Sequence, residues 1–353
     1  SGALPDVVGG VGSLVPPGSP AALATAIREI SDPERWTAAR ERGLARAREC
    51  SWERIARDTT ELYREAVSPA HSRDLHALVV AYGAPDGLDV ALAALGPSIP
   101  AVVVDNSSDP RTRDVCDRHG AHYVDAGSNL GFAAGVNRGL AELSALGRSG
   151  DVLLLNPDAV VAAEGVRSMH EVLLADPALA AVGARQVDPV SGEAARVWWP
   201  FPTPWGAVVE AAGLGSLRRA HGFAIGSVLL LRAEALEALG GMDERFFLYA
   251  EETDWQRRAR DAAWKVDVAD VPATHVGAGT GGDPGRREAH FYGSAERYVR
   301  KHHGAVGWQL YRLANVAGAA LRSAVLTGDR RASAARRRRI FATGPIAWES
   351  AWR

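Results

Sequence analysis

Three clusters, far apart in the chain, have the residue types that metal binding and acid–base chemistry require. Asp158 closes an Asn-Pro-Asp run directly after the apolar run 152–155, the acidic stretch 251–254 opens with Glu251-Glu252, and His275 ends a strand-like segment. Carboxylate oxygens and imidazole nitrogens bind divalent cations, and a carboxylate can also remove a proton from an attacking hydroxyl. Together the clusters predict an enzyme that handles a metal-bound diphosphate.

Each cluster also has an ordinary structural explanation. Asn156-Pro157 suits a polar turn after a strand. Acidic residues are favoured in the first turn of a helix, and Asp254 stands four residues before Arg258, the spacing of a helical ion pair. A lone histidine such as His275 most often packs within the fold. Taken singly, the clusters do not decide between chemistry and structure.

Short apolar runs that alternate with helical stretches predict the framework that positions these clusters. The runs are 77–81, 101–104, 122–124, 152–155 and 180–182. Such a pattern indicates an α/β fold with a mostly parallel sheet covered by helices on both faces. Ligands of these sheets bind at the carboxyl ends of the strands, where Asp105 and Asp158 fall. We expect an antiparallel strand over 224–231 and helices from about 286 onward.

The chain has the length of two domains. In the first part, Ser19-Pro20 resembles a helix cap followed by proline, and we expect helices over 21–30, after Asp32-Pro33 and after Ser51. The predicted division is a helical segment 1–68, a linker 69–75, a catalytic domain 76–285 and a helical basic segment 286–353.

Composition and charge exclude several classes of protein. The formal net charge of −2 gives no overall attraction to nucleic acid, and 47% hydrophobic residues allow a substantial core. No apolar run is long enough to span a membrane and no signal-peptide pattern begins the chain, so we expect a cytoplasmic protein. The two cysteines, Cys50 and Cys116, match no metal-binding spacing.

Positive charge is concentrated near the end of the chain. Residues 286–353 contain 14 Arg and Lys against 4 Asp and Glu. An amphipathic helix over 305–327, followed by four arginines at 336–339, predicts peripheral contact with an anionic membrane at the inner face of the plasma membrane. The alternative is that this helix packs on the core or on a second copy of the chain.

Two loops could contact a nucleotide. The glycine-rich segment from Gly127 to Asn137 enters a helix, and small residues there let the backbone approach a phosphate. Asp105 could accept a hydrogen bond from a base or a ribose. Its neighbours Ser108 and Asp109 could instead cap a helix that begins at Pro110.

Aromatic residues gather between 196 and 205. Trp198, Trp199 and Trp205 suit the apolar faces of sugars as well as membrane interfaces. A half-buried irregular loop explains them equally well.

The order of the motifs resembles family-2 glycosyltransferases of the GT-A fold, especially bacterial rhamnosyltransferase-like members, over residues 76–303. The segments that carry the resemblance are 78–82, 104–108, 129–139, 155–158, 240–247, 251–254 and His275. The resemblance implies a GT-A nucleotide-diphospho-sugar transferase fold with helical N-terminal and C-terminal appendages.

The resemblance also implies a role for each candidate residue. The expected donor-binding residues are Tyr82, Asp105, Asn129, Gly131, Asn137, Asn156 and Asp158. Asp158 and His275 would hold a divalent metal, Mg²⁺ or Mn²⁺, on the donor diphosphate. Glu252 would be the general base, with Glu251 and Asp254 as alternatives. The expected acceptor-binding residues are Trp198, Trp199 and Trp205. The chain departs from the family at Tyr82-Gly83, where Tyr-Asn is usual, and at Glu252, where aspartate is more common.

The implied reaction is a single in-line displacement that inverts the anomeric carbon. The favoured donor is dTDP-rhamnose, and the acceptor is a hydroxyl of a glycan or a lipid-linked glycan. One alternative is a catalytically degenerate glycan- or nucleotide-sugar-binding module, since Asn156 and Glu252 replace commoner acids. A sugar nucleotidyltransferase would need a basic, glycine-rich loop after the first strand, and residues 82–86 contain no Arg or Lys.

Residues 1–68 resemble a different protein, the C-terminal end of a family-4 glycosyltransferase of the GT-B fold. The resemblance lies in 9–18 and 51–56. Because only the last helices of such an enzyme would be present, we expect no transferase activity from this segment.

Overall fold

A computed structural model describes residues 8, 10–49, 51–52, 56, 59, 74–189, 192–215, 222–275 and 283–352. The chain divides into two compact units, Ser1–His71 and Ser72–Arg353, and this division falls within the predicted linker 69–75.

The first unit contains helices α2 (Pro20–Ile30) and α3 (Pro33–Glu49). Ser19 Oγ accepts a hydrogen bond from the Ala22 N–H at 3.4 Å, and Pro20 occupies the first turn, as predicted. Large apolar side chains stay exposed on both helices; they are Leu23, Ile27, Trp36 and Leu44. The helix predicted after Ser51 lies mostly outside the described residues, and the likeness to a GT-B fragment remains a prediction.

The second unit is built on a nine-stranded sheet with the order β3-β2-β1-β4-β10-β6-β11-β5 and with β7 beside β6. Its strands are β1 (Leu75–Ala81), β2 (Ala101–Asp105), β3 (His122–Asp125), β4 (Asp151–Leu155), β5 (Ala159–Val160), β6 (Leu179–Val187), β7 (Ala194–Ala195), β10 (Val228–Leu231) and β11 (Lys265–His275). All five predicted apolar runs are strands. The β-branched, wholly buried run Val102–Val104 illustrates why, since such residues pack well in a sheet covered on both faces.

The predicted antiparallel strand is confirmed in part. β10 runs antiparallel to both β4 and β6 and so separates two parallel groups of strands. Ala224 belongs instead to β9 (Gly222–Ala224), which pairs with β8 (Trp198–Pro200) in a separate two-stranded sheet.

Helices cover both faces of the large sheet, as predicted. One face packs against α5 (Pro85–Leu95), α6 (Pro110–His119) and α8 (Ala163–Ala175). The other face packs against α7 (Phe132–Ala145), α10 (Ala233–Leu239) and α11 (Glu251–Asp261). Trp255 of α11 is fully buried on this second face, which fixes the helix whose first turn carries the acidic pair.

Strand order reverses between β1 and β4. The chain runs outward from β1 through β2 to β3, whereas β4 lies on the opposite side of β1. A crevice forms at the carboxyl ends of the strands on either side of such a switch point. Tyr82 follows β1 and Asn156 follows β4, so the topology brings both to this crevice.

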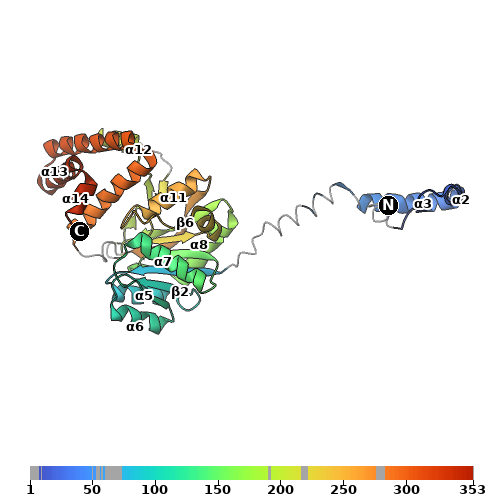
Figure 1. The fold of residues 1–353 in the computed structure, drawn as a ribbon, viewed down its shortest axis with the longest axis horizontal. Coiled ribbons are helices and arrows are strands. Elements are labelled where there is room, and N and C mark those ends of the chain that lie inside the picture. The colour runs from blue at the N-terminus through green and yellow to red at the C-terminus, as the bar shows by residue number, and fades with distance from the viewer. Residues whose placement is uncertain are drawn as a thin grey trace. The chain divides into compact units, whose positions relative to one another are not determined.

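The C-terminal segment is helical, as predicted, and Figure 1 shows its helices gathered at one end of the second unit. These are α12 (Pro284–Val325), α13 (Gly328–Thr343) and α14 (Pro345–Ser350); α12 bends at Gly304, where φ is 68°. They form a third apolar core with α9 (Pro204–Ala211) nearby, and Tyr298, Trp308 and Phe341 are almost fully buried in it.

Candidate active site

Two adjoining cavities lie at the carboxyl edge of the sheet. The first, of about 290 Å³, is lined by five of the predicted donor-binding residues and by His275. Those five are Tyr82, Asn129, Gly131, Asn156 and Asp158. The second cavity, of about 640 Å³, contains Glu251, Glu252 and Trp199. Both cavities are bordered by Asn156, Tyr249 and His275, so a group held in one lies next to a group held in the other.

The glycine-rich loop shapes the first cavity through backbone contacts. Asn129 Oδ1 accepts the Gly131 N–H at 3.0 Å, and Gly131 has a φ of 84°, which few other residues adopt. A Cβ atom at Gly131 would lie 2.4 Å from the Phe247 carbonyl oxygen. Glycine is therefore required here, because the loop and residue 247 touch through their backbones.

Asp158 and His275 come together although 116 residues separate them in the sequence. β5 follows Asp158 and pairs with the end of β11, which places Asp158 Oδ1 3.3 Å from His275 Nε2. Asn156 Nδ2 lies 3.4 Å from the same ring nitrogen. Neither carboxylate oxygen of the buried Asp158 has a hydrogen-bond partner among the described residues.

This pair fits one side of a divalent-metal site. Two ligands of one octahedral ion at about 2.1 Å lie about 3 Å apart, close to the separation seen here. The described parts of the chain contain no group of three or more metal-ligating His, Cys, Asp or Glu side chains. Mg²⁺ is commonly held by one or two carboxylates together with substrate phosphates. Asp158 and His275 therefore suit a metal that a diphosphate helps to hold.

The acidic pair opens α11, as its structural explanation predicts, and it also faces the second cavity. Burial raises the pKa of Glu251 well above its usual value, and the charge of Glu252 raises it further. Burial also raises the pKa of Glu252, but backbone N–H groups of Glu252, Thr253 and Gly226 partly offset that rise. The pair therefore favours holding one proton between its two carboxyl groups, and the backbone N–H groups stabilise a negative charge on Glu252.

The backbone before the acidic pair adopts an uncommon conformation. Tyr249 and Ala250 are consecutive non-glycine residues with φ of 68° each. Such conformations cost energy and persist where the surrounding structure holds them. Here they turn the chain directly into α11, so that Glu251 and Glu252 meet the cavity at the start of the helix.

Asp254, the third candidate for the base, is separated from the other two. Its side chain is wholly buried and pairs with Arg258 at 3.1 Å, Lys301 at 2.6 Å and His302 at 2.8 Å. Burial raises the pKa of Asp254, but hydrogen bonds from His302 and Lys301 hold the pKa below its usual value overall. Asp254 thus joins α11 to α12 and does not line either cavity.

Two of the predicted donor-binding residues, Asp105 and Asn137, make hydrogen bonds to other parts of the fold. Asp105 is fully buried and accepts hydrogen bonds from Ser107, Asp109 and Tyr123, so both its oxygens are engaged in the loop after β2. Asn137 exchanges two hydrogen bonds with the Met242 backbone, at 2.9 and 2.8 Å. Neither residue lines the first cavity. Asp109 caps α6 before Pro110, as the structural alternative predicts.

The three predicted acceptor-binding tryptophans lie in different surroundings. Trp199 is 43% exposed, lines the second cavity and lies beneath the Arg196 guanidinium at 4.0 Å from the ring centre. Trp198 is half-buried and packs against the core. Trp205 is 74% exposed on α9 and lies outside both cavities.

Among the lining residues of the first cavity that were not predicted from the sequence, three have basic side chains. Arg286, Arg287 and His290 line the first cavity from the first turns of α12. Asp283-Pro284 is a helix-start signal that could have located them, because it places a helix N-terminus soon after His275. The glycine-rich segment 277–282, suggested by its composition to be a loop over the ligand, lies outside the described residues.

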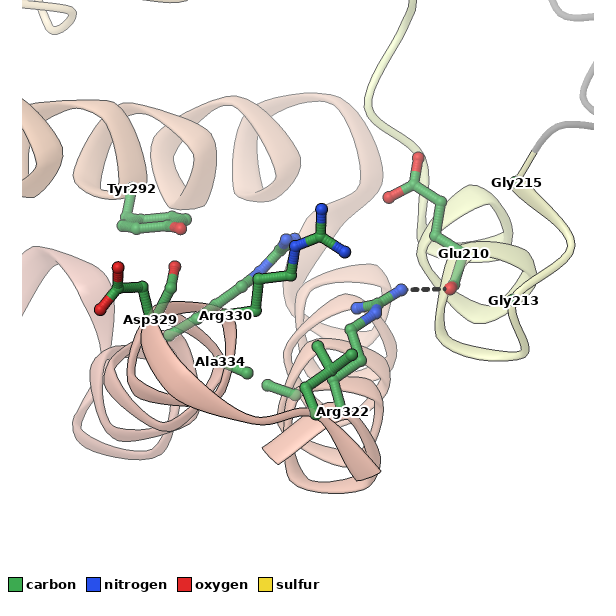
Figure 2. A pocket seen from close by; sticks show the side chains of 12 residues that line it. Glu210, Gly213, Gly215, Tyr292, Arg322, Asp329, Arg330 and Ala334 are labelled. Carbon is green, nitrogen blue, oxygen red and sulfur yellow. Dashed lines mark hydrogen bonds between the residues drawn. The ribbon is translucent and has the colours of Figure 1, made fainter. Parts of the chain in front are cut away.

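A third cavity, of about 730 Å³, lies among α9, α12 and α13 (Figure 2). Arg322, Arg330 and Arg337 line it, and Arg322 donates to the Glu210 carbonyl at 2.6 Å. Glu210 and Arg337 also border the second cavity. The basic surface of the C-terminal helices thus continues to the edge of the apolar cavity that holds the acidic pair.

Residues 78–240 match the family model described as glycosyl transferase family 2. A low-salt glycan biosynthesis hexosyltransferase of Haloferax volcanii is 29% identical over 201 residues, which are 53% of this chain and 62% of that protein. An N-acetylglucosaminyl-diphospho-decaprenol L-rhamnosyltransferase of Mycobacterium tuberculosis is 29% identical over 207 residues, 52% of this chain and 67% of that protein. This chain therefore spans less than two thirds of the first relative's length.

Two solved structures have a similar arrangement. A mannosyltransferase from Pyrobaculum calidifontis, in complex with GDP-Man and Mn²⁺, covers 80% of this chain and 84% of its own, with a TM-score of 0.48 and 16% identity. The glucosyl-3-phosphoglycerate synthase of Mycobacterium tuberculosis covers 64% of this chain and 80% of its own, with a TM-score of 0.46 and 14% identity.

Proposed function

We propose that this chain, in which residues 78–240 form a glycosyl transferase family 2 domain within a GT-A fold, transfers a sugar from a nucleotide-diphosphate donor to an acceptor hydroxyl. One observation carries the proposal: a cavity suited to a metal-bound diphosphate adjoins a cavity that contains a carboxylate pair of raised pKa. Their common border at Asn156 and His275 is where the sugar would pass from donor to acceptor.

In the proposed reaction the acceptor hydroxyl attacks the anomeric carbon from the face opposite the diphosphate. A bond forms between the acceptor oxygen and the anomeric carbon as the bond to the diphosphate oxygen breaks, and the proton moves to Glu252. Asp158 and His275 would hold a divalent cation, which would neutralise negative charge on the departing nucleoside diphosphate. Asn129 and Gly131 shape the loop on the donor side. Glu251, kept neutral, leaves Glu252 as the charged base.

The donor and acceptor are proposed more narrowly from the relatives. The mycobacterial relative is named as an L-rhamnosyltransferase that acts on a diphospho-decaprenol-linked sugar, which supports dTDP-rhamnose and a lipid-linked glycan. The second cavity has an aromatic wall that includes Phe223, Phe291 and Tyr311, and the arginine-lined third cavity lies beside it. An aromatic cavity next to an arginine-lined cavity suits an acceptor in which a sugar is joined to a phosphate. The aromatic rings would contact the sugar, and the arginines would bind the phosphate.

A screen of nucleotide-sugar donors tests the proposal. We expect the full chain with Mn²⁺ to release nucleoside diphosphate from one donor much faster than from the others, because transferases leak sugar slowly to water. Product release is measured by chromatography with and without EDTA. A matched sample with Glu252→Gln identifies contaminating hydrolases. Binding of nucleoside diphosphate without hydrolysis or transfer of any donor would instead support the degenerate binding module.

We also propose that the C-terminal helices make peripheral contact with an anionic membrane. Exposed apolar side chains recur at helical spacing on one face of α12, where Val306, Leu310 and Leu313 are 76%, 52% and 63% exposed. Arg338 and Arg339 are exposed on α13. An exposed apolar stripe on α12, together with exposed basic residues on α13, which packs against α12, suits the surface of an anionic bilayer. None of the described helices is long and apolar enough to span one.

Liposome sedimentation tests this contact. We expect vesicles containing phosphatidylglycerol to bind the chain, and Arg338→Ala with Arg339→Ala to weaken binding by about 10-fold or more, since each basic residue near such a surface contributes about 1 kcal/mol. Arg40→Ala with Arg42→Ala removes the same charge from exposed positions on α3 and serves as the control. Binding that ignores anionic lipid, with a dimer in light scattering, would assign the stripe to a second copy of the chain.

A further inference from the structure

A buried ionic cluster joins the first cavity to the last helix of the chain. His290 of α12 lines that cavity and is only 6% exposed. Its Nδ1 atom lies 2.7 Å from Glu349 Oε1 of α14. Glu349 is 1% exposed and accepts a second hydrogen bond, from Arg297, on its other oxygen. The residue that lines the cavity is therefore anchored from a helix that does not line it.

The cluster defines the hydrogen-bonding state of the imidazole. Burial raises the pKa of Glu349, but hydrogen bonds from His290 and Arg297 bring it below its usual value overall. An ionised carboxylate can only accept, so the hydrogen in this contact belongs to His290 Nδ1. The other ring nitrogen, Nε2, is buried and has no hydrogen-bond partner among the described residues.

The surroundings of His290 hold the ring rigidly beside the glycine-rich loop. The ring packs against Phe247 in a tilted arrangement, with 5.0 Å between ring centres and 30° between ring planes. The Phe247 carbonyl accepts the Phe132 N–H at 2.7 Å, next to the close backbone approach at Gly131. Arg286, one turn earlier on α12, lines the same cavity. A fixed imidazole and a guanidinium thus belong to the cavity that also holds Asp158 and His275.

We propose that His290 binds a diphosphate oxygen of the donor through its Nε2–H, and that Glu349 is a positioning residue that orients this ring. The inference rests on the proposed function, because it takes the first cavity as the donor site. A buried polar atom without a partner is costly, and a phosphate oxygen would satisfy it. An imidazole that donates through both nitrogens is a cation, here placed between two anions, the Glu349 carboxylate and the diphosphate.

Two substitutions at His290 separate its two nitrogens. Asparagine can still donate to Glu349 from near the Nδ1 position but has no group at the Nε2 position, whereas glutamine can reach the Nε2 position. We expect His290→Asn to weaken binding of a nucleoside diphosphate by about 10-fold or more, and His290→Gln to retain most of the affinity. Isothermal calorimetry with dTDP, UDP and GDP in the presence of Mn²⁺ measures this. Binding of the corresponding nucleosides should stay the same in both variants.

Glu349 has a matched control on the same helices. Glu296 of α12 is 5% exposed, and its Oε2 accepts the Ile346 N–H at 3.1 Å, so it also ties α14 to α12. We expect Glu349→Gln to weaken diphosphate binding several-fold and Glu296→Gln to leave it unchanged. Thermal unfolding establishes that each variant is folded.

The possible outcomes separate the role of His290 and Glu349 from the proposed function on which that role rests. A wild-type chain that binds none of the three diphosphates would overturn the proposed function itself. A wild-type chain that binds one of them, with His290→Asn binding it equally well, would overturn the role of His290 alone. Equal losses in Glu349→Gln and Glu296→Gln would show that Glu349 acts by attaching α14, which overturns its positioning role.

Discussion

Replacing Glu252 with glutamine is expected to lower the turnover of sugar transfer by about 10²- to 10⁴-fold, the usual contribution of a general base. Glutamine has the same shape but cannot accept the hydroxyl proton. Donor binding should change little, because the first cavity does not include Glu252. The measurement is kcat and KM with the donor identified by the screen, together with calorimetry for the nucleoside diphosphate.

The pH dependence of kcat/KM is a second, independent test of Glu252 as the general base. Because burial raises the pKa of Glu252, kcat/KM should rise with pH through a pKa higher than that of an ordinary glutamate. This rise should disappear in Glu252→Gln. A residual profile with the same midpoint would assign the titration to another group.

The raised pKa of Glu252 also predicts how stability depends on pH, and this dependence is opposite in direction to that of kcat/KM. Between the usual glutamate pKa and the raised one, the folded chain holds a proton that the unfolded chain has lost. Stability contributed by this carboxyl therefore falls as pH rises through that window. Glu252→Gln should be at least as stable as the wild type at neutral pH, as measured by thermal unfolding. A clear loss of stability would mean that the lost activity reflects damage to the fold.

Glu251→Gln is the matched control for Glu252. Backbone N–H groups favour a charged Glu252 more than a charged Glu251, so a neutral glutamine at position 251 resembles the proposed resting state of the pair. Its effect on kcat should be much smaller than that of Glu252→Gln. If the two effects are reversed, the base is Glu251.

Asp158→Asn is expected to reduce kcat/KM by at least about 100-fold, since the charge stabilisation that a metal ion supplies is worth several kcal/mol. Asparagine keeps the shape of the side chain and removes the carboxylate that no described residue satisfies. Binding of nucleoside diphosphate should lose its dependence on Mn²⁺. The reason is that the proposed metal is held by Asp158 and His275 on one side and by the diphosphate on the other. Calorimetry with and without Mn²⁺ measures this coupling.

Asp86→Asn provides the control for Asp158. Asp86 is exposed in the first turn of α5 and lines neither cavity. It should leave both turnover and the effect of Mn²⁺ unchanged. A wild-type enzyme that is fully active in EDTA, with Asp158→Asn equally active, would remove the metal from the proposal.

Much of the fold could be predicted because parallel strands buried on both faces are continuous apolar runs. Val152–Leu155 is such a run, and the residues that follow it must reach the sheet edge where ligands bind. That reasoning placed Asn156 and Asp158 in the first cavity. The β5–β11 pairing that brings His275 to Asp158 could not be predicted from either segment alone, yet motif order indicated the same pair.

The incomplete part of the site prediction concerns side chains whose partners lie far away in the sequence. Asn137 was a donor-binding candidate by position, but its amide is engaged by the backbone of Met242. The helix-start signal at Asp283-Pro284 indicates only that His290 lies on a helix, because the contact of its ring depends on Glu349, 59 residues later. Periodicity and turn residues report local structure, whereas such pairings are decided by how helices pack.

The position of β10 has a consequence for the order in which the chain can fold during synthesis. β10 lies between β4 and β6, although it is made after both. Until residues 228–231 leave the ribosome, the nascent chain carries two unjoined sheet edges, one on β4 and one on β6. Open edges invite pairing with other chains. We therefore expect the interval between the synthesis of β6 and that of β10 to be the stage at which the nascent chain depends most on chaperones.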